Sequence, residues 1–170
     1  MKLAENVLRR FIFGKPVQTI LFVGERNRDA SAVAELLLNH YSAIAVKEGK
    51  QPVRASSAGI WAEEGLGIST RAAAFLASRG IDSGAFRSRK FREQMCDENQ
   101  LTITLDMGVK GMLLFKKPEA VIYTFSEYSL MGADISKASE LDDSEYARTM
   151  EELAEMTERT NKRASRNVTY

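Results

Sequence analysis

The sequence is poor in the residue types that build disulfide frameworks and metal sites. Its 170 residues include one cysteine, Cys96, and one histidine, His40. A single cysteine excludes an internal disulfide and a cysteine-rich zinc site, and a single histidine excludes a multi-histidine metal centre. We therefore expect a protein without a metal or other cofactor.

Neither sign of charge dominates, and no long apolar run is present. Lysine and arginine total 24 against 23 aspartate and glutamate residues, a net charge of +1. Proteins that bind nucleic acid normally carry a basic excess. No apolar run reaches the roughly 18 residues of a membrane span, and charged residues interrupt the first 16 residues, unlike a secretory signal. We expect a cytoplasmic protein that binds neither nucleic acid nor membranes.

Apolar segments of two kinds alternate along the chain. Strands are predicted at 17–23, 53–57, 101–105 and 120–125. Helices are predicted at 30–46, 69–79, 109–115 and 142–164, with Gly80 ending the second of them in the left-handed conformation. The first strand is nearly continuously apolar, which is typical of a strand covered on both faces. The alternation predicts β-α-β units around a parallel sheet.

We divide the chain into three segments. Residues 1–16 are predicted to form a helical extension, because five apolar residues share one helix face: Leu3, Val7, Leu8, Phe11 and Ile12. This extension either packs on the domain or contacts a partner, such as a second copy in a homodimer. Residues 17–164 form the α/β domain, and 165–170 are expected to be a flexible polar tail.

The loop after the first strand is the first candidate site. In open parallel sheets, ligands bind beyond the carboxyl ends of the strands. Here that position leads into a helix, whose first N–H groups attract anions. The predicted anion-binding loop consists of Gly24, Glu25, Arg26, Asn27, Arg28, Asp29, Ala30 and Ser31.

The residues around this loop resemble the low-molecular-weight protein tyrosine phosphatases, a family that includes related bacterial arsenate reductases. Its loop typically reads V-C-x-G-N-x-C-R-S-P-x-A-E, and this chain reads VGERNRDASAVAE from Val23 to Glu35. Further similarity lies at 53–59, 71–82, 88–89 and 97–107. The resemblance covers about residues 17–160 and implies a three-layer α/β/α fold with a four-stranded parallel sheet.

The two residues that carry the chemistry of this family differ here. A cysteine thiolate at the start of the loop attacks phosphorus, and an arginine six residues later binds the phosphoryl oxygens. Gly24 and Ala30 stand at these positions. Cys96 cannot replace the nucleophile, because Thr102 rather than an arginine follows it by six residues. The resemblance therefore implies a pseudophosphatase.

The acid of the family is less easily located. It is an aspartate followed by proline, about nine residues before an aromatic residue, and it protonates the leaving group. Tyr146 can fill the aromatic position, but Lys137 stands nine residues before it. Asp134 is the nearest aspartate and reaches the acid position only with a small insertion, so we leave this assignment open.

The resemblance also implies supporting residues. Asn27 matches the residue that holds the loop in a left-handed conformation, and Ser31 matches the hydroxyl beside the nucleophile. Ser57 matches the serine that braces the loop asparagine. Trp61 stands where the family places a pocket wall.

The charged side chains of the loop allow two opposite outcomes. Arg26 or Arg28 can turn inward and bind a phosphate. Alternatively, Glu25 or Asp29 can occupy the loop amides and exclude anions. The sequence does not decide between an open and a self-occluded loop.

Three functional hypotheses follow. The first is an inactive phosphatase-like protein that binds a phosphate-like anion, a phosphoprotein or another protein. The second is a working phosphatase or other hydrolase that uses non-standard residues, with Glu25, Asp29 and Asp134 as candidate bases. The third is an interaction module with a vestigial loop, in which the N-terminal helix makes the contact.

Overall fold

The computed structural model describes residues 17–166. The helix predicted within 1–16 lies outside the described residues, as do the last four residues of the predicted tail. Ser165 is buried at the end of the last helix, and its amide donates to the carbonyl of Asn161 over 2.9 Å.

Four parallel strands form the sheet, as predicted. They are β1 (Thr19–Gly24), β2 (Arg54–Gly59), β3 (Leu101–Thr104) and β4 (Ile122–Thr124), in the spatial order β2-β1-β3-β4. The first strand lies inside the sheet, which agrees with its nearly continuous apolar sequence. The order changes direction at β1, so the loop that leaves β1 lies where parallel sheets bind ligands.

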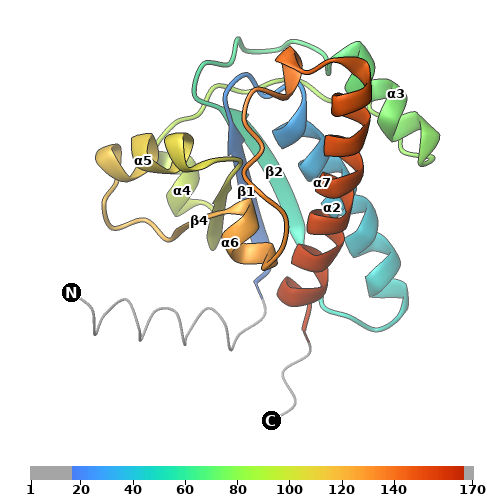
Figure 1. Cartoon of the computed structure of the whole chain (residues 1–170). Coiled ribbons are helices and arrows are strands. Elements are labelled where there is room, and N and C mark those ends of the chain that lie inside the picture. The colour runs from blue at the N-terminus through green and yellow to red at the C-terminus, as the bar shows by residue number, and fades with distance from the viewer. Residues whose placement is uncertain (1–16, 167–170) are drawn as a thin grey trace.

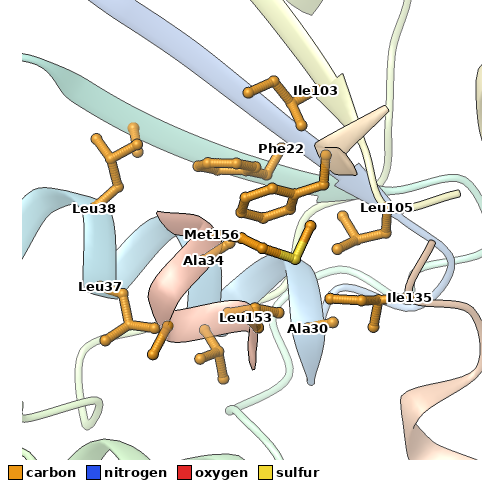
Figure 2. Packing of buried hydrophobic residues seen from close by; sticks show 14 of the residues in the cluster. Phe22, Ala30, Ala34, Leu37, Leu38, Ile103, Leu105, Ile135, Leu153 and Met156 are labelled. Carbon is orange, nitrogen blue, oxygen red and sulfur yellow. The ribbon is translucent and has the colours of Figure 1, made fainter. Parts of the chain in front are cut away.

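Helices cover both faces of the sheet (Figure 1). On one face lie α2 (Ala30–Lys47), α3 (Thr70–Ser78), α6 (Phe125–Ser129) and α7 (Asp143–Ala164). Figure 2 shows Phe22 and Ile103 of the sheet facing Ala34 of α2 and Met156 of α7. The other face is covered by α4 (Gln94–Asp97) and α5 (Met107–Lys116). The predicted three-layer α/β/α fold is therefore confirmed.

The prediction missed three short helical segments: α4, α6 and η1 (Ala138–Glu140). The strand predicted at 120–125 is shorter than expected, because Thr124 is both the last residue of β4 and the N-cap of α6. Its hydroxyl accepts from the amide of Glu127, and the carboxylate of Glu127 accepts from the amide of Thr124. This reciprocal capping ends the strand.

Residues 17–166 contain neither a membrane-spanning helix nor a cluster of metal-binding side chains. None of the helices described there is long and apolar enough to span a membrane. In the same part of the chain, no three His, Cys, Asp or Glu side chains converge on a position that could hold a metal ion.

Candidate anion-binding site

The loop from Glu25 to Asp29 joins β1 to α2 and is fixed to the loop that follows β2. The carbonyls of Gly24 and Glu25 accept hydrogen bonds from the amides of Ile60 (3.0 Å) and Trp61 (2.7 Å). A Cβ atom at Gly59 would lie 2.5 Å from the Glu25 carbonyl oxygen. Glycine is therefore required at position 59 for the two loops to approach this closely.

Asn27 holds the loop from inside. It has a φ of 58° and is buried. Its Nδ2 donates to the hydroxyls of Ser31 (3.1 Å) and Ser57 (2.8 Å), and its Oδ1 accepts from the Arg89 amide (2.9 Å). The structure thus brings together Asn27, Ser31 and Ser57, the three residues that the sequence analysis assigned to support of the loop.

Two charged residues behind the loop extend this network. The Ser57 hydroxyl donates to the carboxylate of Glu35, and the guanidinium of Arg89 donates to the Ser57 carbonyl over 3.1 and 3.0 Å. Burial raises the pKa of Glu35, although the hydrogen bond from Ser57 and the charge of Arg89 oppose this shift. Neither charged residue was assigned a role from the sequence, although both lie within the segments that resemble the phosphatase family.

A small cavity of about 50 Å³ lies above the loop. Its walls come from the loop, from the end of β3 and from the segment before η1: Gly24, Glu25, Arg26, Asn27, Arg28, Asp29, Ala30, Ser31, Leu105, Asp106, Ile135, Lys137, Ala138 and Ser139. Within the described part of the chain, the amides of residues 26–31 donate to no protein acceptor. Free N–H groups at the start of an 18-residue helix make a suitable environment for an anion.

The acidic side chains of the loop do not accept hydrogen bonds from these amides. The Asp29 carboxylate accepts from the hydroxyls of Ser69 and Tyr146. Burial raises the pKa of Tyr146, and the nearby negative charge of the Asp29 carboxylate raises it further. Among the described residues, no amide of the loop donates to the carboxylate of Glu25. The structure therefore corresponds to the open alternative rather than the self-occluded one.

The two arginines of the loop differ in their surroundings. The Nε atom of Arg28 donates to the carbonyl of Gly67 over 2.8 Å, so its guanidinium is tied to the neighbouring loop. Arg26 is exposed at the edge of the cavity. Of the two, Arg26 is therefore better placed to contact an anion without breaking an existing hydrogen bond.

Asp134 does not line the cavity, whereas Lys137 does. The carboxylate of Asp134 accepts from the Met107 amide (2.9 Å) and the Ser126 hydroxyl (3.3 Å). Lys137 has a left-handed backbone, with a φ of 51°. Lys137, nine positions before Tyr146, thus reaches the cavity as a cation instead of an acid. It was assigned no role from the sequence, although the nine-residue spacing could have identified it.

Three further candidates have clear positions. Trp61 is 63% exposed and supports the loop through its backbone amide, but its side chain does not line the cavity. Cys96 lies in α4, outside the cavity, and burial raises the pKa of its thiol. A Cβ atom at Gly24 would lie 3.2 Å from Ser31 Oγ. A side chain at position 24 would therefore start beside the hydroxyl of Ser31.

The chain is similar in structure to several phosphatases. It matches a low molecular weight protein tyrosine phosphatase from T. tengcongensis with 27% identity and a TM-score of 0.76, covering 84% of this chain and 96% of that one. It matches the YwlE arginine phosphatase from Geobacillus stearothermophilus with 26% identity and a TM-score of 0.73, covering 85% and 91% of the two chains.

A third solved structure, the tyrosine phosphatase Wzb from Escherichia coli K30 in complex with sulphate, shares the fold at 18% identity and a TM-score of 0.73, covering 86% and 97%. No curated protein sequence matches this chain. Residues 19–169 match the family described as low molecular weight phosphotyrosine protein phosphatase. The chain belongs to this family.

Proposed function

We propose that this protein is a catalytically inactive member of its family, which binds a phosphate-like anion in the loop between β1 and α2. The anion is carried by a phosphorylated protein. The proposal rests on one observation. The loop keeps its hydrogen-bonded shape and its cavity, although Gly24 stands at its start and Ala30 at its end.

The residues at these two positions support the absence of phosphatase chemistry. Glycine has no nucleophile, and alanine has no guanidinium to bind phosphoryl oxygens as charge develops on them. The thiol of Cys96 lies outside the cavity. A phosphorylated side chain in this loop would meet hydrogen-bond donors but no cysteine that could attack it.

The donors around the cavity support binding. The amides of residues 26–31, which donate to no acceptor among the described residues, supply neutral donors, and the N-terminus of α2 adds partial positive charge. Arg26 and Lys137 bring two cations to the wall of the cavity. In our proposal these two side chains supply the charge that an arginine at position 30 would otherwise provide.

The second hypothesis, a hydrolase that activates water, has less support. Of its three candidate bases, Asp29 is held by Ser69 and Tyr146, and Asp134 lies outside the cavity. Of the three, only Glu25 lines the cavity with a carboxylate that accepts no hydrogen bond from another described residue. A purely structural loop is the third hypothesis, and it predicts no anion binding.

Calorimetric titration separates binding from a vestigial loop. The relatives named above act on phosphorylated tyrosine and arginine, so the probes are inorganic phosphate, phosphotyrosine and phosphoarginine. We expect at least one probe to bind, and we expect Arg26→Ala and Lys137→Ala each to weaken binding by about five- to tenfold, the order of one charge-assisted contact.

The matched control is Arg54→Ala, which removes an exposed cation at the start of β2, the opposite end of that strand from the loop. This variant should bind as the wild type does. Absence of binding for all three probes contradicts the proposal. Equal weakening by all three alanine variants contradicts the assigned roles of Arg26 and Lys137.

A further inference from the structure

Arg71, in the first turn of α3, joins this helix to segments about 70 residues away in sequence. Its guanidinium donates to the carbonyls of Leu141 (2.7 Å) and Ser139 (3.2 Å), and its guanidinium carbon lies 4.0 Å from the centroid of the Tyr146 ring. A further contact to the Asp143 carboxylate (3.2 Å) is exposed and contributes little. Arg71 therefore holds η1 and the start of α7 in place.

The segment that Arg71 holds brings Lys137 to the cavity. Lys137 directly precedes η1 with a φ of 51°, a conformation that a lysine keeps only where surrounding contacts impose it. At one end of this segment, the amide of the buried Ile135 donates to the carbonyl of Leu105 over 2.8 Å. At the other end, Arg71 binds the carbonyls in and after η1. These two anchors fix the turn that carries Lys137.

The Tyr146 ring on which Arg71 lies is fixed relative to the anion-binding loop. Its hydroxyl donates over 2.8 Å to the carboxylate of Asp29, the last residue of the loop before α2. Ser69, two positions before Arg71, donates to the same carboxylate. The guanidinium is therefore placed relative to the loop by two routes, its own helix and the aromatic ring.

We propose that Arg71 is a positioning residue of the anion site, which sets the place of Lys137 relative to the loop. It does not line the cavity and acts through the segment that carries Lys137. A guanidinium suits this role because its planar fork donates to two carbonyls while its face stacks on an aromatic ring, and an ammonium cannot do both. The inference rests on the proposed function, because it concerns a cation that binds the anion.

A double-mutant cycle tests whether Arg71 acts through Lys137. The affinities for inorganic phosphate, phosphotyrosine and phosphoarginine are measured by calorimetric titration. We expect Arg71→Met alone to weaken binding by about three- to tenfold, and to weaken it less than about twofold when Lys137→Ala is already present. A merely structural role would weaken binding equally in both backgrounds, and that result overturns the proposal.

Arg71→Lys is a milder second variant, which keeps the positive charge but not the planar fork. We expect it to weaken binding by at least about twofold, because one ammonium cannot reproduce both carbonyl contacts and the stacking. An Arg71→Lys variant with the affinity of the wild type would show that only the charge at this position counts. That result also overturns the proposal.

The matched control is Arg79→Met, at the other end of α3. Arg79 also lies over an aromatic ring (Phe75, 5.0 Å) and pairs with α7 through Glu151, but neither partner lines the cavity. This variant should bind as the wild type does, and weakening equal to that of Arg71→Met overturns the proposal. A wild type that binds none of the probes contradicts the proposed function itself. A wild type that binds while the Arg71 variants bind equally well overturns only the role of Arg71.

Discussion

Glu35, Ser57, Asn27 and Ser31 form a continuous chain of hydrogen bonds from the protein interior to the wall of the cavity. Buried polar groups of this kind are costly unless they are all satisfied, so the chain fixes the loop in one conformation. The loop therefore keeps its shape even though glycine and alanine stand at its two ends. The residues that fix the shape of the loop are different from those at positions 24 and 30. The shape can therefore persist where the residues needed for phosphatase chemistry are absent.

The raised pKa of Glu35 makes stability depend on pH. The folded state favours the protonated carboxyl, so the free energy of unfolding falls as the pH rises from the ordinary value of 4.5 toward the raised value, and is constant above it. Glu35→Gln cannot lose a proton. We therefore expect urea unfolding to show that the free energy of unfolding of this variant increases relative to that of the wild type as the pH rises through this range.

The control for this measurement is Glu48→Gln, which changes an exposed carboxylate at the end of the same helix. Its unfolding free energy should follow that of the wild type at every pH. If the curve for Glu35→Gln also runs parallel to the wild type, burial of the Glu35 carboxylate does not cost stability and our account of this residue is incorrect.

Single residues also mark the limit of what the sequence predicts. The matched spacing identified Asn27, Ser31 and Ser57, because their partners lie in segments that the family pattern fixes. It could not decide which way the charged side chains turn. The Asp29 carboxylate is held by Ser69 and Tyr146, which are 40 and 117 residues away in sequence. Such contacts exist only once the fold has formed.

Among the elements, two exposed glycines should respond in opposite ways to substitution by alanine, because one lies inside a helix and the other just after one. Gly111 lies in open space inside α5 with an ordinary backbone, so Gly111→Ala should raise the free energy of unfolding by roughly 0.5–1 kcal/mol. Gly80 follows α3 with a φ of +72°, so Gly80→Ala should lower it by about 1 kcal/mol. Chemical unfolding measures both changes. Changes of the same sign would contradict this explanation.

The longer elements were predictable and the shorter ones were not. Helix α7 has 22 residues and a regular apolar stripe, and the prediction placed its start within one residue. Helices α4 and α6 have four and five residues, which is too short for a helical period to appear. The shortened strand β4 has the same origin, because the Thr124–Glu127 cap is a reciprocal contact rather than a periodic pattern.

At the scale of the whole molecule, the sheet order explains why the site lies where it does. Because β1 lies between β2 and β3, its exit loop is bordered by the segments that follow both neighbours. Ile60 and Trp61 hold the loop from the β2 side, and Leu105 and Asp106 form the wall on the β3 side. The fold thus shapes the cavity from segments on both sides of β1.

In our proposal, this cavity binds a phosphorylated group and does not hydrolyse it. A ³¹P NMR spectrum of phosphotyrosine with the protein reports both events in one sample. We predict that the phosphotyrosine resonance shifts or broadens as protein is added, and that no inorganic phosphate resonance appears with time. Growth of the phosphate resonance would contradict the inactive assignment, and a phosphotyrosine resonance that the protein leaves unchanged would contradict binding of this phosphorylated group.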